Sequence, residues 1–164
     1  MVEGSAAARS IAPMSAGAVQ AESNEILTKT VVIHFFPNSW DLYKKVAQNE
    51  NGKEQQALYD PNVDFVIEEV AKLAGQYGAA RIVVEGHTDS SYKGQIPAQA
   101  VKDLSERRAN AVKEALVRKY PSLDPRQFSC QGMGWDKPAD PKDPMNQALN
   151  RRVEIKVFPL EAAP

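Results

Sequence analysis

Short apolar segments alternate with longer amphipathic ones along this chain, and that order restricts the folds it can adopt. Four short segments, rich in β-branched and aromatic residues or alternating apolar with polar, are predicted strands: Thr30–Phe36, Arg81–Glu85, Phe128–Gln131 and Arg152–Phe158. Two segments, from Pro61 to Tyr77 and from about Ala98 to Tyr120, carry apolar residues at helical spacing. The order strand, helix, strand, helix, strand, strand predicts an α/β sandwich, with two helices packed on one face of a mixed four-stranded sheet.

Local signals predict where the first helix begins and ends. Asp60 is the expected N-cap, Pro61 occupies the first helical position, and Gly78 closes the helix. Between the first strand and this helix, Trp40 to Ala47 is predicted to form two helical turns, and residues 49–53 a polar loop.

The two ends of the chain differ from its middle. Residues 1–25 are rich in Ala, Ser and Gly without a sustained period, so they are predicted to be a flexible arm or linker. Residues 26–160 are predicted to form one domain, a size sufficient to bury a core.

Charge and hydropathy exclude several classes of function. The 20 basic and 21 acidic side chains nearly balance, which argues against a general binder of nucleic acid or membrane surfaces. No apolar stretch is long enough to span a bilayer, and no signal peptide is visible, so any membrane anchor is expected to lie outside this chain. The lone cysteine, Cys130, excludes an internal disulfide and a multi-cysteine zinc site.

Candidate site residues follow the second strand and lie on the second helix. Asp89, at the end of Gly86-His87-Thr88-Asp89, is placed to hold a ligand cation or to cap a turn of its own backbone. Arg108 lies beside the apolar stripe of its helix, where it can offer two parallel donors to a carboxylate or belong to a solvated face.

Two enzymatic alternatives remain open on the residues alone. His34, His87 and Asp89 suggest a metal site, but no further metal-binding motif supports it. A nucleophilic pair of Cys130 with a histidine is conceivable, although an inert buried thiol is the simpler interpretation. Gly132-Met133-Gly134 lacks the strand–helix context of a dinucleotide site, and the phosphate-loop lysine motif is absent.

Three motifs in order identify a family. They are Gly86-His87-Thr88-Asp89, Leu104-Ser105-x-x-Arg108-Ala109-x-x-Val112-x-x-x-Leu116, and Asn150-Arg151-Arg152-Val153-Glu154-Ile155. Together they resemble the OmpA C-terminal-like peptidoglycan-binding domain, which also occurs in peptidoglycan-associated lipoproteins and flagellar stator proteins. The resemblance covers about residues 28–158 and implies a βαβαββ sandwich.

The resemblance also implies a ligand and a site. Members of the family hold the peptidoglycan stem peptide non-covalently through its diaminopimelate residue. By resemblance, Asp89 binds the ammonium group of the ligand and Arg108 its carboxylate, Arg151 is a second carboxylate contact, and Thr88 and Asn38 orient the ligand. No catalysis and no cofactor are implied.

This chain departs from the family pattern in three places. Val101 occupies a position that is usually Asn, the loop between Asp89 and Leu104 is longer, and the region from Trp40 to Tyr59 is extended. The resemblance predicts a periplasmic cell-wall tether, attached to the outer or inner membrane through a segment absent from this chain. The alternative is a protein-interaction or assembly module of an envelope complex that uses the same fold without binding the wall.

Overall fold

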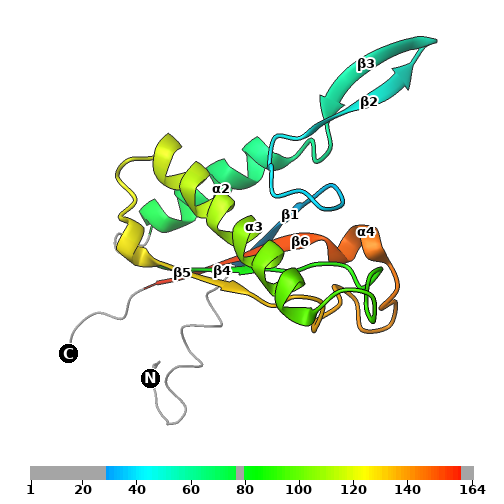
Figure 1. The fold of residues 1–164 in the computed structure, drawn as a ribbon. Helices are drawn as coiled ribbons and strands as arrows, with labels where there is room; N and C mark the ends of the chain where they lie inside the picture. The colour runs from blue at the N-terminus through cyan, green and yellow to red at the C-terminus, as the bar shows by residue number, and fades with distance from the viewer. Residues whose placement is uncertain (1–28, 77–79, 160–164) are drawn as a thin grey trace.

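A mixed four-stranded sheet forms the centre of the computed structural model, which describes residues 29–76 and 80–159 (Figure 1). Its strands are β1 (Lys29–His34), β4 (Arg81–Gly86), β5 (Phe128–Gly132) and β6 (Arg152–Phe158), in the spatial order β1-β6-β4-β5. β6 runs antiparallel to both β1 and β4, whereas β4 and β5 are parallel. The four predicted strands and their mixed arrangement are confirmed.

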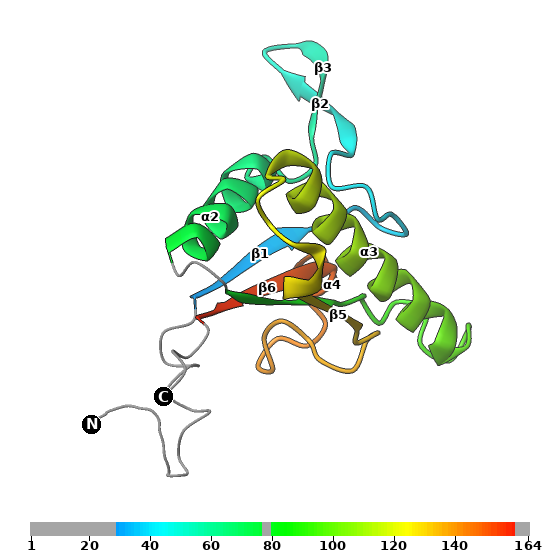
Figure 2. The same ribbon diagram turned by 90° about the vertical axis from the view of Figure 1, so that its left-hand side faces the viewer.

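Two helices cover one face of this sheet, α2 (Val63–Gln76) and α3 (Ala98–Lys119) (Figure 2). Their apolar stripes pack on alternate residues of the strands, because side chains of a strand alternate between its two faces. The central core residues are fully buried: Ile33, Ile67, Val70, Ile82, Val84, Val112, Leu116 and Ile155.

Close packing of α3 on the sheet depends on glycine. A side chain at Gly86, the last residue of β4, would overlap the backbone of Ser105 on α3. The hydroxyl of Ser105 accepts a hydrogen bond from the Gly134 amide at 3.0 Å. The close approach at Gly86 holds α3 against the end of β4, where the candidate site residues begin, and the hydrogen bond holds it against the loop after β5.

The segment after β1 is a hairpin, which corrects the prediction of two helical turns from Trp40 to Ala47. β2 (Lys45–Glu50) and β3 (Lys53–Leu58) pair with each other and project from the body of the molecule (Figure 1). Asn51 and Gly52, predicted as loop, are its two turn residues, with φ of 54° and 76°. Asn-Gly is the preferred pair for such a turn.

The start of α2 is also shifted. The carboxylate of Asp60 accepts hydrogen bonds from the amides of Asn62 at 2.9 Å and of His34 at 2.8 Å, so it caps a turn and holds this turn to β1. The helix itself begins at Val63. Gly78 and the arm predicted for residues 1–25 lie outside the described residues. Two short elements were not predicted, the 3₁₀ turn Pro125–Gln127 and α4 (Gln147–Asn150).

Candidate ligand-binding site

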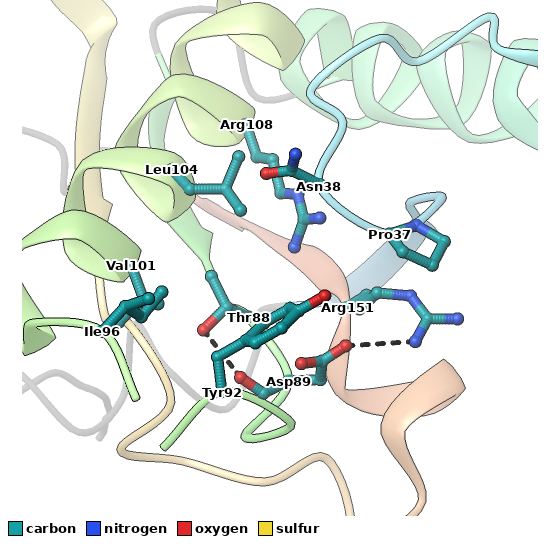
Figure 3. Close-up of a pocket in the computed structure, with 10 residues that line it drawn as sticks. All are labelled: Pro37, Asn38, Thr88, Asp89, Tyr92, Ile96, Val101, Leu104, Arg108 and Arg151. Atoms are coloured by element: carbon teal, nitrogen blue, oxygen red, sulfur yellow. Dashed lines mark hydrogen bonds and ion pairs between the residues drawn. The ribbon is translucent and has the colours of Figure 1, made fainter. Parts of the chain in front are cut away.

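A small pocket of about 90 Å³ lies between the end of β4, the N-terminal half of α3 and the loop after β1 (Figure 3). It is lined by all five predicted site residues, Asn38, Thr88, Asp89, Arg108 and Arg151. They come from four segments that are far apart in the sequence. The structure therefore brings these residues together, while their roles toward a ligand remain predictions.

Arg108 is built into the wall of this pocket. Its side chain is only 1% exposed, which contradicts the alternative of a solvated helix face. The guanidinium donates to three backbone carbonyls, with Nε 2.7 Å from Ser39 O, Nη1 2.9 Å from His87 O and Nη2 3.3 Å from Phe36 O. It also lies 5.3 Å from the centre of the Phe35 ring. Two chain segments, the loop after β1 and the end of β4, thus hold the guanidinium in one orientation.

The charge of Arg108 has no direct counter-ion among the described residues. None of the ion pairs in this part of the chain includes Arg108, and its three protein acceptors are neutral carbonyls. Burial lowers its pKa to about 10, while the nearby charge of Asp89 acts in the opposite direction. Because a guanidinium has five N–H donors, two remain for a ligand.

Asp89 is paired with Arg151 and not with Arg108. Oδ2 of Asp89 accepts a hydrogen bond from Arg151 Nη1 at 3.2 Å, and Oδ1 accepts one from the Ser91 amide at 3.0 Å. Arg151 is in turn held by the Phe35 carbonyl at 3.1 Å and the Tyr59 hydroxyl at 3.1 Å. Asp89 is therefore both a turn-capping residue and a carboxylate that faces the pocket (Figure 3).

Asn38 and Thr88 border the pocket on either side of Arg108. Asn38 has a φ of 56°, a left-handed conformation that asparagine tolerates better than most residues. This turn directs the Phe36 and Ser39 carbonyls at Arg108. The Thr88 hydroxyl donates to the Asp89 carbonyl at 3.1 Å, and its amide donates to Gly134 O at 2.8 Å.

An apolar wall completes the pocket and was not predicted. It consists of Pro37, Tyr92, Ile96, Val101 and Leu104. Val101 and Leu104 could have been inferred from the face of α3 that carries Arg108. Tyr92 and Ile96 lie in the loop before α3, where no periodicity marks them.

The enzymatic alternatives do not assemble as predicted. Cys130 Sγ lies 3.9 Å from the Ala109 carbonyl, and burial raises the pKa of this thiol. His34 lies beside Asp60, and His87 beside Glu85, so these histidines do not meet at Asp89. Burial, assisted by the charge of Arg152, lowers the pKa of His87 to about 4. Its imidazole is therefore neutral at neutral pH.

Comparison with known proteins identifies the family. The sequence pattern described as the OmpA family matches residues 53–152, more than half of the chain. This chain belongs to the OmpA family. Outer membrane protein Omp38 of Acinetobacter baumannii is 42% identical to it over 88 residues, which cover 53% of this chain and 23% of Omp38. Outer membrane porin F of Pseudomonas aeruginosa is 39% identical over 93 residues, which cover 56% of this chain and 25% of the porin.

The OmpA-family chain thus spans about a quarter of the length of these curated relatives. Solved structures show the same fold. The peptidoglycan-associated lipoprotein from Burkholderia pseudomallei superposes with a TM-score of 0.53 at 18% identity, over 77% of this chain and 88% of that one. The OmpA-like domain of FopA1 from Francisella tularensis superposes with a TM-score of 0.55 at 18% identity, over 84% of this chain and 77% of that one.

These comparisons confirm the predicted family and fold class. The family and its named relatives are porins and other envelope proteins rather than enzymes, which confirms the non-enzymatic prediction. None of the helices in the described part of the chain is both long and apolar enough to cross a bilayer.

Proposed function

We propose that this OmpA-family domain binds peptidoglycan through the diaminopimelate residue of the stem peptide and so tethers an envelope protein to the cell wall. The observation that carries the proposal is the buried guanidinium of Arg108, which lines the pocket without an ion pair to any described carboxylate, while Asp89 lies on the opposite wall.

The charges of the pocket fit the free end of diaminopimelate. This end carries an ammonium and a carboxylate on one carbon, so it needs an anion and a cation on opposite sides of a narrow space. The two unused donors of Arg108 match the carboxylate, and Asp89 matches the ammonium by charge-assisted hydrogen bonds. The apolar wall of Ile96, Val101 and Leu104 suits the methylene groups between the two ends of the ligand.

Selectivity follows from the same pairing. A lysine in the stem peptide has the ammonium but lacks the second carboxylate, so it would leave the Arg108 charge buried without a partner. Leaving a buried charged donor unpaired costs about 2–3 kcal/mol, or roughly 30- to 150-fold in affinity. Val101, in place of the usual Asn, removes a polar contact, so we expect the affinity to depend mainly on the two charges.

Calorimetric titration with a diaminopimelate-containing stem peptide tests the proposal, with the lysine-containing peptide as the control ligand. Asp89→Asn keeps the shape of the side chain and should weaken binding by at least about 30-fold. Asp103→Asn, an exposed change on α3, is the matched control and should bind like the wild type. Equal binding of both peptides, or an unchanged affinity in Asp89→Asn, would contradict the proposal.

The domain boundaries and location belong to the same proposal. Residues 26–160 would form the wall-binding domain in the periplasm, and residues 1–25 would link it to a membrane-attached segment outside this chain. The naming of two relatives as outer membrane proteins supports this location.

One observation favours the alternative of an assembly module. Phe36, Trp40, Tyr43 and Phe65 are all exposed, and Trp40 is 47% exposed near the base of the projecting hairpin. Aromatic residues are enriched at protein interfaces. Failure of the stem peptide to bind, together with capture of an envelope protein that is lost in Trp40→Ser, would favour this function.

A further inference from the structure

Two glutamates and a histidine gather on the face of the sheet opposite α2 and α3. Glu85 on β4 and Glu154 on β6 are directly paired across the two antiparallel strands, so their side chains point to the same face. His87 follows Glu85 by two residues and lies on the same side. One ligand atom from each of the three residues lies within 4.8 Å of the others.

Among residues 29–76 and 80–159, neither ring nitrogen of His87 has a hydrogen-bond partner. Its side chain is 1% exposed, and neither Nδ1 nor Nε2 makes a hydrogen bond. Nε2 is directed at Glu85 but is 3.9 Å from Oε1, too far for a hydrogen bond. A buried polar group without a partner is costly, and an ion between the imidazole and the carboxylates would remove that cost.

We propose that Glu85, His87 and Glu154 form a site for a divalent transition-metal ion, and zinc is the ion used to test it. One imidazole nitrogen and two carboxylate oxygens are a donor set that zinc accepts at about 2.0–2.2 Å, with water completing a tetrahedron. The ligand atoms lie within 4.8 Å of one another, so the two glutamate side chains would have to rotate toward the ion to bind it at these distances. Both carboxylates are partly exposed, so the ion can enter from solvent.

Among the described residues, Arg152 and Lys156 contact the carboxylates of the site, and the charge of Lys137 also acts on His87. Arg152 donates from Nε to Glu154 Oε2 at 2.6 Å, which leaves Oε1 of that carboxylate for the metal ion. Lys156 Nζ lies 3.4 Å from Glu85 Oε1, the oxygen that also faces His87. Because Lys156 is 32% exposed, its ammonium can move into solvent, and the metal ion takes its place.

The site does not depend on the proposed wall binding, but it is linked to the pocket through the backbone. The carbonyl of His87 accepts the hydrogen bond from Arg108 Nη1 at 2.9 Å, and Thr88 and Asp89 follow directly. An ion on the His87 ring would therefore hold the end of β4 from the face opposite the pocket.

The test is calorimetric titration of the full chain with zinc chloride after treatment with a chelator. We expect one equivalent of zinc to bind. Glu85→Gln, which keeps the side-chain shape, should weaken binding by about tenfold or more. Lys156→Met should tighten it, because the competing ammonium is gone. Glu114→Gln, a substitution at an exposed position of α3, is the matched control and should bind zinc like the wild type.

A second measurement locates the ion in the unmodified chain, so it needs no substitution that could destabilise the fold. The chain has two histidines, His34 and His87, so their imidazole NMR signals can be assigned separately. Zinc should shift the His87 ring signals and leave those of His34 in place. Lack of binding up to millimolar zinc, equal affinity in Glu85→Gln, or a shift confined to His34 would each overturn the proposal.

Discussion

At the scale of single residues, the charge that the pocket offers to a ligand depends on which arginine is paired with Asp89. Arg108 donates to carbonyls alone, whereas Arg151 bonds Asp89, Tyr59 and the Phe35 carbonyl. A buried cation held by neutral groups keeps its charge available to a ligand. A cation already bonded to Asp89 instead fixes the direction of that carboxylate. This arrangement gives the two arginines different roles.

The role of Arg151 can be tested by combining two substitutions. Arg151→Met should weaken binding of the diaminopimelate peptide by about tenfold, because Asp89 loses the bond that directs it. Both substitutions act through one carboxylate. The double variant, Asp89→Asn with Arg151→Met, should therefore bind the peptide no more weakly than the weaker-binding single variant. Additive losses, measured by calorimetry, would instead show that Arg151 contacts the ligand independently.

Cys130 is predicted to be chemically inert. Burial raises the pKa of its thiol above the usual range, so little thiolate exists at neutral pH. Alkylation by iodoacetamide should be slow in the folded protein and reach the rate of an ordinary thiol only after denaturation. Fast labelling of the native chain near neutral pH would revive the hypothesis of a nucleophilic cysteine.

At the scale of elements, the contact between α3 and the end of β4 decides where Arg108 lies. Gly86→Ala places a methyl group into the backbone of Ser105, so α3 must move away from the strand. We expect a loss of about 3 kcal/mol in the free energy of unfolding, measured with urea, and weaker peptide binding.

Gly75 provides the control for this substitution. It lies in α2, and a side chain there meets nothing within 4 Å. Gly75→Ala should therefore stabilise the protein by about 0.5–1 kcal/mol through higher helix propensity. Equal effects of the two substitutions would show that the close approach at Gly86 is unimportant.

The hairpin β2–β3 should behave as a separate element. Its strands pair with each other and not with the central sheet. Gly52→Ala strains a residue with a φ of 76° by about 1 kcal/mol, so amide exchange in residues 45–58 should accelerate. The melting temperature of the whole domain should barely change. A large drop in that temperature would mean that the hairpin supports the core.

At the scale of the whole molecule, one sheet separates two candidate sites. The pocket around Arg108 opens beside α3, and the proposed metal site lies on the opposite face of the sheet, so a substitution in one site touches no residue of the other. The proposed domain boundary makes a further prediction. If residues 1–25 are a linker, as proposed, a chain starting at residue 26 should melt within about 2 °C of the full chain, because a linker outside the core adds little stability. A large fall in melting temperature would place residues 1–25 in the fold.

The sequence by itself determined the elements of the core. Apolar periodicity is a local property, so the four central strands and two long helices could be predicted within a few residues. The hairpin was missed, although Asn51-Gly52 is a strong turn signal, because its polar strands bury little and show no apolar alternation. The three family motifs contain Thr88, Asp89, Arg108 and Arg151, and the resemblance adds Asn38 from the loop after the first strand; all five line one pocket, while their roles stay predictions.

Only the tertiary structure decided how those residues are paired. Asp89 meets Arg151 because β6 begins beside the end of β4, and Arg108 meets three carbonyls because α3 is held against Gly86. The apolar wall and the glutamate–histidine cluster likewise depend on strand register and loop path. These relations join residues far apart in the chain, and spacing along a sequence carries no information on distances of that kind.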